Sequence, residues 1–505
     1  MKQLSIIQQI DQFAYSYPQK IVYQDHEKAY TYQQLKEASD KIACYLAQHF
    51  PNRKPVVVFG ELEFEMLAAF LGAVKAGHAY IPIERHTPTQ RIELILQTAQ
   101  PTCILAVAEF TDVQVDCPVL DYAQLLQAAV DPTELAQLQP VSGVENFYII
   151  FTSGTTGVPK GVQISHDNLQ SFVDWELSDF ALPKEQAFLS QAPYSFDLSV
   201  MSIYPALASG GRLIPLPKAV VEDFKQLFTR LPELAINVWV STPSFIDICL
   251  MAPEFDQAHL PKLSHFLFCG EELTIQTAKK LKERFPQAHI FNTYGPTEAT
   301  VAISRVEITD AILADAKRLP IGYVKPDSRV IIMEEGQVVA PGEIGEIVIV
   351  GPSVSKGYLN NPTKTSEAFF DYQGQPAYKT GDAGQLTEEG LLLYNGRMDF
   401  QVKLHGYRME LEDIDHHLMQ VSYVDKATVV PKYHQHKVQQ LVAFVVAKPN
   451  EFEKEFALTK AIKAELAQSV MDYMIPQRFI YVDELPRTAN GKIDRKGLMN
   501  EVNSA

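Results

Sequence analysis

Short apolar runs alternate with stretches of helical periodicity along most of this 505-residue chain. Residues 55–59 predict a buried strand, and residues 61–77 predict a helix whose apolar side chains share one face and which ends before Gly77. Further strands are predicted over residues 79–83, 147–151, 238–241, 266–269 and 289–292. This alternation favours an α/β fold with mostly parallel sheets, which bind ligands at the carboxyl ends of their strands.

The pattern changes near residue 320. Residues 344–350 and 391–396 predict strands of a smaller β-rich subdomain, which we place at about 320–396. Beyond it, strands are predicted over residues 427–430 and 441–447, and a helix over residues 459–470. We therefore expect a large N-terminal core over residues 1–396 and a small α+β C-terminal domain over residues 397–505.

Composition narrows the class of protein. Apolar residues make up 46% and charged residues 21%, as in soluble globular chains, and the net charge of −17 argues against general affinity for nucleic acid or anionic membranes. The five cysteines are scattered without metal-binding spacing, which suits reduced thiols in the cytoplasm. No signal-peptide pattern opens the chain, and the apolar run at 441–447 is too short to cross a bilayer, so we expect no membrane insertion.

Residues 151–161 form a loop of glycines, hydroxyl side chains and a lysine directly after the strand predicted at 147–151. Glycines allow backbone N–H groups to face an anion, and Thr152, Ser153 and Lys160 add donors and charge, so the loop suits phosphate. The common P-loop pattern is absent because no Gly-Lys-Ser/Thr follows at its spacing. The alternative is a polar surface turn.

Residues 292–298 close another predicted strand with the sequence NTYGPTE. The ring of Tyr294 suits stacking on a base, the hydroxyl of Thr297 suits a phosphate, and the carboxylate of Glu298 suits Mg²⁺, which prefers oxygen ligands. The alternative for each is a role in a turn or cap.

Three later motifs add charged groups. Asp382 follows a turn and suits a pair of ribose hydroxyls, whereas Arg397 suits phosphate or ribose. Lys492 lies on a glycine-containing loop near the C-terminus. The histidines at 416–417, 434 and 436 have no zinc-like grouping, so we expect solvated or packed side chains there.

These motifs, together with YTYQQL at 30–35 and KAGHAYIP at 75–82, occur in the order found in the adenylate-forming superfamily, which the chain resembles over nearly its whole length. That superfamily contains acyl-CoA synthetases, peptide-synthetase adenylation domains and luciferases. The resemblance implies an enzyme in which a substrate carboxylate attacks the α-phosphate of ATP, pyrophosphate leaves, and an acyl-adenylate forms. It also implies Mg²⁺ at Glu298.

The resemblance assigns roles residue by residue. Lys492 and Arg397 are the expected catalytic residues, Asp399 is the expected hinge of a mobile C-terminal domain, and Gly406 is expected to line a thiol channel. Lys160 ranks below Lys492. The ATP site implied by the resemblance comprises Thr152, Ser153, Asn292, Thr293, Tyr294, Gly295, Pro296, Thr297, Asp382, Tyr394, Asn395, Gly396, Arg397 and Lys492.

Asp197, in the segment SFDLSVM at 195–201, distinguishes between substrates. In members that activate amino acids, an aspartate here binds the substrate ammonium; the alternative is a carboxylate that stabilises a helix N-terminus. The chain most closely resembles the D-alanine–D-alanyl carrier protein ligases of teichoic acid D-alanylation. In that family Cys269, Val301 and Lys492 would also contact D-alanine, although Cys269 also fits a small buried apolar residue.

The resemblance implies that a separate carrier protein, which presents a phosphopantetheine thiol, accepts the D-alanyl group, since no carrier-attachment motif is apparent after the lysine loop. Three alternatives stay open: another amino-acid adenylating enzyme, an acyl-CoA ligase, and a nucleotide-binding regulator that does not turn over. Asp197 counts against the acyl-CoA ligase, and Glu298, Asp382, Arg397 and Lys492 count against the regulator.

Overall fold

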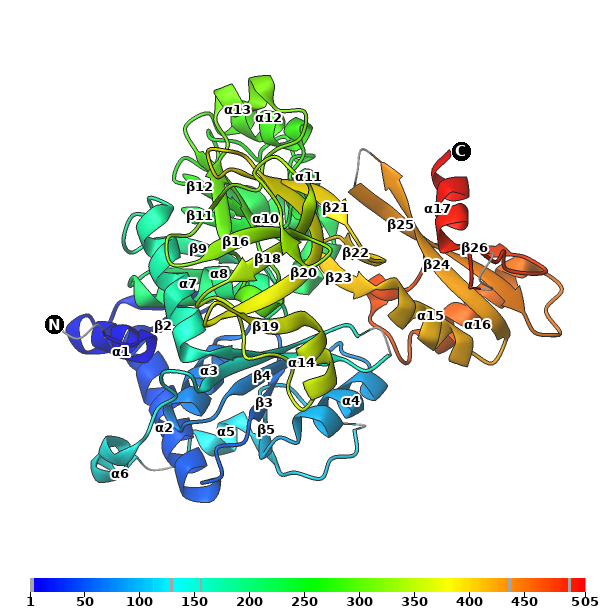
Figure 1. Cartoon of the computed structure of the whole chain (residues 1–505). Coiled ribbons are helices and arrows are strands. Elements are labelled where there is room, and N and C mark those ends of the chain that lie inside the picture. Colours follow the sequence, from blue (N-terminus) through cyan, green and yellow to red (C-terminus); the bar gives the residue numbers. More distant parts are fainter. Residues whose placement is uncertain are drawn as a thin grey trace.

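The computed structural model describes residues 4–111, 113–127, 130–154, 157–434, 437–488 and 492–504. Within these residues the strands form five sheets. Figure 1 shows three of these sheets, which are described below as the first, second and third, packed in one large body, with the C-terminal strands and helices beside it. Across the described residues, no helix combines the length and the apolar character needed to cross a membrane.

The first sheet has the order β6-β5-β3-β4-β7-β8 and is parallel except for β8. Its central strand β3 has the sequence VVVFG and is buried on both faces, as expected of a parallel strand covered by helices. The strands are β3 (Val56–Gly60), β4 (Tyr80–Glu84), β5 (Cys103–Ala106), β6 (Val119–Asp121), β7 (Asn146–Thr152) and β8 (Lys160–Ser165).

The second sheet has the order β15-β14-β13-β12-β11-β9-β10-β1-β2, with a parallel centre and antiparallel strands at both edges. The strands predicted near 238, 266 and 289 are thus confirmed, and in the sheet they are neighbours. The strands are β1 (Ile21–Gln24), β2 (Ala29–Thr31), β9 (Ala187–Ser190), β10 (Arg212–Pro215), β11 (Val238–Ser241), β12 (His265–Phe268), β13 (His289–Tyr294), β14 (Ser304–Glu307) and β15 (Tyr323–Val324).

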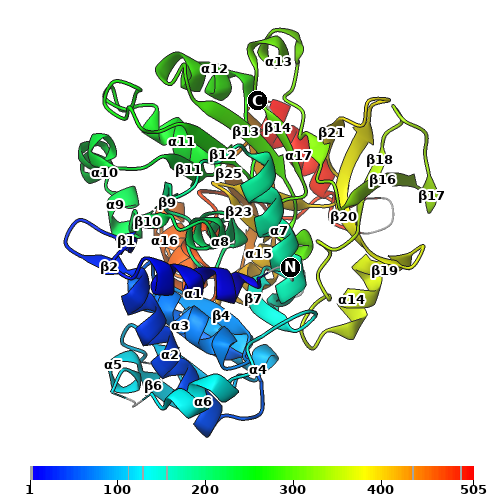
Figure 2. The same cartoon turned by 90° about the vertical axis from the view of Figure 1, so that its left-hand side faces the viewer.

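Helices pack against both sheets (Figure 2). The helix predicted over residues 61–77 runs from Phe64 to Lys75, and Gly77 has a φ of +89°, which an L side chain rarely adopts. The helices of this body are α1 (Ile6–Ser16), α2 (Tyr32–His49), α3 (Phe64–Lys75), α4 (Thr89–Ala99), α5 (Tyr122–Leu125), α6 (Pro132–Gln137), α7 (His166–Asp179), α8 (Val200–Ala208), α9 (Lys218–Glu222), α10 (Phe224–Arg230), α11 (Pro243–Cys249), α12 (Ile275–Arg284) and α13 (Asp310–Asp315), with 3₁₀ turns η1 (Asp197–Ser199), η2 (Leu231–Glu233) and η3 (Thr297–Ala299).

The third sheet is the antiparallel, β-rich unit expected after residue 320. Its long strand β20 pairs with β18, β19 and β21, and this pairing places Asp382 opposite Arg397. The elements are β16 (Arg329–Glu334), β17 (Gln337–Val338), β18 (Gly345–Val350), α14 (Pro362–Ala368), β19 (Phe369–Tyr372), β20 (Gln375–Leu386) and β21 (Leu392–Arg397).

The C-terminal elements form a two-stranded hairpin and a three-stranded sheet with three helices. The helix predicted over residues 459–470 is α16, which lies four residues earlier at both ends, and Leu458, Ile462 and Leu466 form its buried face. The elements are β22 (Gln401–Leu404), β23 (Tyr407–Glu410), α15 (Leu411–Gln420), β24 (Val424–His434), β25 (Lys437–Ala447), α16 (Glu455–Leu466), η4 (Asp472–Met474), β26 (Arg478–Tyr481) and α17 (Arg495–Ser504).

A buried ionic cluster fastens α1, α2 and α3 to one another. The Lys75 ammonium, on a residue that is 3% exposed, donates to Asp11 and Asp40 at 2.7 Å each and to the Ser39 hydroxyl at 3.0 Å. A buried ammonium needs such partners because it has lost its water. The cluster therefore orders the N-terminal helix on the body.

We expect Asp40→Ala to lower the free energy of unfolding by about 3 kcal/mol, because it leaves the Lys75 ammonium with one carboxylate in place of two. Urea unfolding measures the change. Asp425→Ala is the matched control, since Asp425 pairs at 3.9 Å with Lys426 on the surface. Equal losses in the two variants would contradict the role of the cluster.

Candidate active site

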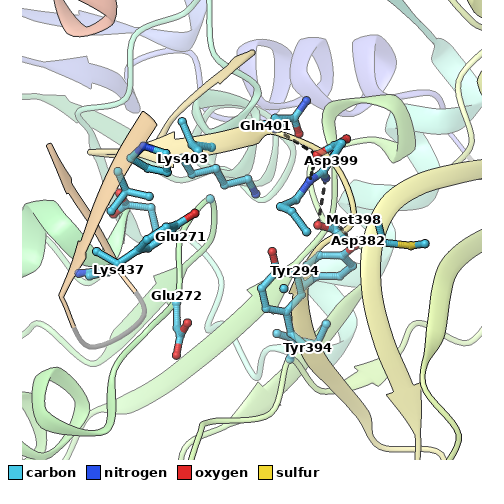
Figure 3. Close-up of a pocket in the computed structure, with 18 of the residues that line it drawn as sticks. Glu271, Glu272, Tyr294, Asp382, Tyr394, Met398, Asp399, Gln401, Lys403 and Lys437 are labelled. Carbon is cyan, nitrogen blue, oxygen red and sulfur yellow. Dashed lines mark hydrogen bonds and ion pairs between the residues drawn. The ribbon is translucent and has the colours of Figure 1, made fainter. Parts of the chain in front are cut away.

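A cavity of about 350 Å³ lies beside the carboxyl ends of β12 and β13, between them and β21, β22, β24 and β25. Figure 3 shows Lys403 and Lys437 across it from Tyr294 and Asp382. The residues predicted for the nucleotide that line it are Asn292, Thr293, Tyr294, Gly295, Asp382, Tyr394, Gly396 and Arg397. The structure thus gathers residues from two sheets at the edge where an α/β fold binds ligands.

Asp382 is held from two sides. The Tyr294 hydroxyl, at the end of β13, donates to Oδ2 at 2.5 Å, and Nη1 of Arg397, at the end of β21, donates to Oδ1 at 3.0 Å. Burial and the adjacent Asp382 raise the pKa of Tyr294 well above its usual value, so the phenol stays protonated. Each carboxylate oxygen keeps a second lone pair, so Asp382 can still accept from ligand hydroxyls.

Arg397 also joins the predicted hinge. It donates to the Thr380 carbonyl at 3.0 Å and forms an ion pair with Asp399, in which Nε lies 2.8 Å from Oδ1. Burial lowers the pKa of Arg397, but Asp382 and Asp399 outweigh this and hold it above its usual value. The guanidinium is therefore a fixed cation at the border between the third sheet and the C-terminal elements.

A second cavity of about 570 Å³ shares Gly295, Asp382, Arg397 and Lys403 with the first, so the two border one another. It reaches the phosphate loop, the predicted substrate residues and the turn of the β22–β23 hairpin. The predicted residues that line it are Thr152, Ser153, Asp197, Cys269, Gly295, Pro296, Thr297, Val301, Asp382, Arg397 and Gly406.

Asp197 opens the turn η1 and faces this second cavity. Loss of water around the carboxylate raises its pKa, while a hydrogen bond with Thr297 and the positive charge of Lys403 oppose that rise. A desolvated carboxylate of this kind gains from a ligand cation, since pairing restores what burial removes. The site therefore suits a substrate that carries an ammonium group.

Cys269 and Val301 contact each other at the cavity wall. The thiol of Cys269 lies 3.7 Å from the carbonyl oxygen of Val301. Thr300 and Val301 have φ values of +57° and +68°, a region that β-branched residues strongly avoid. Strain of this kind persists where the surrounding structure fixes it, often at functional sites. The surrounding structure therefore holds Thr300 and Val301 in one conformation, as a wall of the cavity beside Cys269.

Glu298 is fully buried, and both its oxygens have partners. The Tyr358 hydroxyl donates to Oε1 at 2.8 Å, and Nη1 of Arg408 donates to Oε2 at 2.6 Å. Burial raises the pKa of Glu298, but Arg408 and Lys160 outweigh it and lower the pKa to about 2. The group is thus an ionised oxygen donor. Within the described residues no three His, Cys, Asp or Glu side chains gather as a metal site.

Some predicted residues lie apart. Asn395 and Lys492 are exposed and line neither cavity, whereas Asp399 borders the first. The backbone N–H of Thr488 donates to the carbonyl of Lys492 at 2.7 Å, next to an isolated bridge between Arg487 and Ile493. Thr155 and Thr156 of the phosphate loop, and His436, lie outside the described residues.

Sequence reasoning missed three charged residues at the site. Arg408 and Lys403 flank Gly406 in the hairpin, and both line the second cavity. Glu84, at the end of β4, accepts from the Ser195 hydroxyl at 2.7 Å and so holds the segment that leads to Asp197. The sequence does hold a signal for each of them: Lys403 and Arg408 are two cationic residues around one glycine, and Glu84 is a carboxylate at the end of a buried strand.

Comparison with known proteins places the chain in a family. The family model of the AMP-binding enzyme matches residues 10–359, and that of the AMP-binding enzyme C-terminal domain matches residues 413–492. The chain belongs to the AMP-binding enzyme family. The predicted superfamily resemblance is therefore confirmed, and the cavities described above lie within an enzyme of this family.

Relatives agree over the full length. The D-alanine–D-alanyl carrier protein ligase of Lactiplantibacillus plantarum is 56% identical over 503 residues, which cover 99% of each chain. The protein of the same name from Streptococcus agalactiae serotype V is 53% identical, again with 99% of each chain covered.

Solved structures share the α/β fold. Holo-PA1221, an NRPS protein containing adenylation and PCP domains, has a TM-score of 0.82 at 26% identity and covers 98% of this chain and 84% of its own. The Vibrio cholerae adenylation domain AlmE has a TM-score of 0.81 at 24% identity, with 99% of this chain and 97% of its own covered. The predicted fold class is thus confirmed.

Glu84 generates a pH prediction. Burial raises its pKa from 4.5 to about 7, although the Ser195 hydrogen bond opposes the rise. The folded state therefore binds a proton that the unfolded chain releases, so stability falls as pH rises from about 4.5 to about 7. We expect wild type, relative to Glu84→Gln, to lose about 3 kcal/mol of unfolding free energy between pH 4.5 and pH 8.

Urea unfolding of both proteins at the two pH values checks this difference. Glu109→Gln, which removes an exposed carboxylate, is the matched control. A pH-independent gap between wild type and Glu84→Gln would contradict the assignment.

Proposed function

We propose that this chain uses ATP to activate D-alanine as D-alanyl-adenylate, with release of pyrophosphate. It then transfers the D-alanyl group to the phosphopantetheine thiol of a separate carrier protein for teichoic acid D-alanylation. One observation carries the proposal: the desolvated carboxylate of Asp197 and the nucleotide-type network of Asp382 and Arg397 line the same cavity. The identity of 51–56% to ligases of this name supports the substrate.

The chemistry follows from charge and position. The substrate ammonium pairs with Asp197, which directs the substrate carboxylate toward the α-phosphate of ATP, while Asp382 accepts from the ribose hydroxyls. Fixing both reactants in one cavity removes much of the entropic barrier to their reaction. Cys269 and the strained wall at Val301 limit the space beside the substrate carbon, which suits a methyl side chain.

The buried, ionised carboxylate of Glu298 fits Mg²⁺, a hard cation that usually takes one or two protein carboxylates and completes its shell with phosphate oxygens and water. When bound, Mg²⁺ would offset the negative charge of the phosphates. Ser153 and Lys160 of the phosphate loop supply the neighbouring donor and cation.

Lys492 is assigned to the first half-reaction, in which its ammonium would contact both the substrate carboxylate and the α-phosphate. Because Lys492 is exposed in the described arrangement, this role requires residues 397–505 to turn about the segment at Asp399. The described arrangement, with Gly406 at the second cavity, suits the transfer to the thiol.

ATP–pyrophosphate exchange tests the adenylation step. We expect exchange to be strongest with D-alanine among D-alanine, L-alanine, glycine, D-serine and short fatty acids. Lys492→Ala should lower the rate about 10²–10³-fold, because one positioned donor to the transition state is lost. Lys460→Ala, at an exposed lysine of the same domain, is the control. Strongest exchange with a fatty acid or an L-amino acid would overturn the substrate, and no exchange at all would favour a regulator.

Asp197→Asn keeps the size of the side chain and removes its charge. We expect the KM for D-alanine to rise at least about 10-fold while the KM for ATP changes little, because the lost contact is a charge-assisted hydrogen bond to the substrate ammonium. Exchange kinetics with each substrate varied in turn measure both constants. Equal changes in the two KM values would contradict the assigned contact.

A further inference from the structure

Strand β23 is from the C-terminal part of the chain (Figure 1), and it contacts Ser153 of the phosphate loop and Glu298. The Ser153 hydroxyl donates to the carbonyl of Arg408 at 3.3 Å and accepts from the N–H of Glu410 at 3.2 Å. The contact extends to α15, because a Cβ at Gly157 would lie 2.5 Å from the ring of His416. The hairpin is therefore seated in the place that the proposed function gives to the polyphosphate.

The charges of β23 match those of the ligands that it excludes. The Arg408 guanidinium pairs with Glu298 at 2.6 Å, where the proposed function has a divalent cation. Two residues later, the Glu410 carboxylate lies 3.5 Å from the Lys160 ammonium, where the proposed function has a phosphate. A cation thus faces the carboxylate, and an anion faces the lysine.

Each of these protein groups needs a partner because it is shielded from water. Glu298 is 0% exposed and the side chain of Lys160 is 13% exposed. An ion left unpaired in such a place is costly, so either β23 or a ligand must satisfy it. Arg408 occupies the space beside Oε2 of Glu298, and Glu410 occupies the space beside the Lys160 ammonium, so β23 and a ligand cannot hold these places at the same time.

We propose that Arg408 and Glu410 of β23 compete directly with magnesium pyrophosphate for Glu298, Lys160 and Ser153. This inference rests on the proposed function and names the residues that couple the phosphate site to the C-terminal domain. The hairpin can occupy the site only after pyrophosphate has left, and pyrophosphate at the site displaces the hairpin. Arg408 is thus a positioning residue, which sets the orientation of the C-terminal domain according to the occupancy of the phosphate site.

Thermodynamic linkage makes the competition measurable in both directions. If pyrophosphate favours the displaced hairpin, then weakening the docked hairpin must raise the affinity for pyrophosphate, by at most the factor by which docking is weakened. We expect Arg408→Gln and Glu410→Gln each to bind magnesium pyrophosphate about 10-fold more tightly than wild type, within the usual range for coupled sites. Calorimetry on the full chain, without ATP or D-alanine, measures this affinity.

Orientation is followed independently by energy transfer between dyes at Val338 in β17 and Phe456 in α16, which are 50% and 80% exposed. In wild type, magnesium pyrophosphate should shift the transfer efficiency, and in Arg408→Gln the midpoint should fall about 10-fold. Arg408→Lys, which keeps the positive charge, should restore much of the wild-type midpoint. Lys426→Gln removes an exposed cation from the same domain and should behave as wild type.

Three results decide the matter. Tighter binding in both β23 variants, with the matching shift in orientation, supports the competition. Equal affinity in wild type, Arg408→Gln, Glu410→Gln and Lys426→Gln overturns it while leaving the proposed function intact. Failure of all four proteins to bind magnesium pyrophosphate overturns the proposed phosphate site, and the competition with it.

Discussion

The site depends on one carboxylate that two sheets hold from opposite sides. Tyr294 reaches Asp382 from the end of the second sheet, and Arg397 reaches it from the end of the third. Asp382 and Arg397 are paired within the third sheet, so the hydrogen bond from Tyr294 ties the second sheet to this pair at the edge of the first cavity. Because Arg397 also pairs with Asp399, the same network leads directly into the segment that precedes the C-terminal hairpin. The residues predicted for the nucleotide and the predicted hinge are therefore parts of one hydrogen-bonded unit.

Three carboxylates that are shielded from water near the cavities show how the charge of the neighbouring group decides the pKa of a carboxylate. Glu298 is paired with Arg408, and its pKa falls to about 2. Glu84 has a hydroxyl as its close partner, and its pKa rises to about 7. Asp197 has a raised pKa, which suits a group whose cation arrives with the substrate. Burial acts in the same direction on all three, so the differences come from the charge that each one faces.

The sequence was sufficient for the fold class, and most of the residues that it predicted for the site line the two cavities. Strands such as residues 238–241 were predictable because parallel strands buried on both faces are continuous apolar runs. The turn at Gly77 was predictable because a positive φ favours glycine. The predicted start of helix α16 was four residues late, because its first residues, Glu455 and Phe456, are exposed and so add nothing to the buried face that marks the helix. The motifs around Asn292, Asp382 and Arg397 were predictable because they stand at strand ends.

Contacts between segments that lie far apart along the chain could not be predicted from the sequence. Arg408 lies 110 positions from Glu298, and no local pattern reports that pair. The place of Lys492 could not be predicted for the same reason. Arg408, Glu410 and Lys492 belong to one C-terminal domain, so when Arg408 and Glu410 contact Glu298 and Lys160, Lys492 lies away from both cavities. Under the proposed function the C-terminal domain serves two half-reactions, so one sequence must hold contacts for both orientations. The motifs predict the two sets together, and in the proposed competition the buried charges at Glu298 and Lys160 decide which set is made.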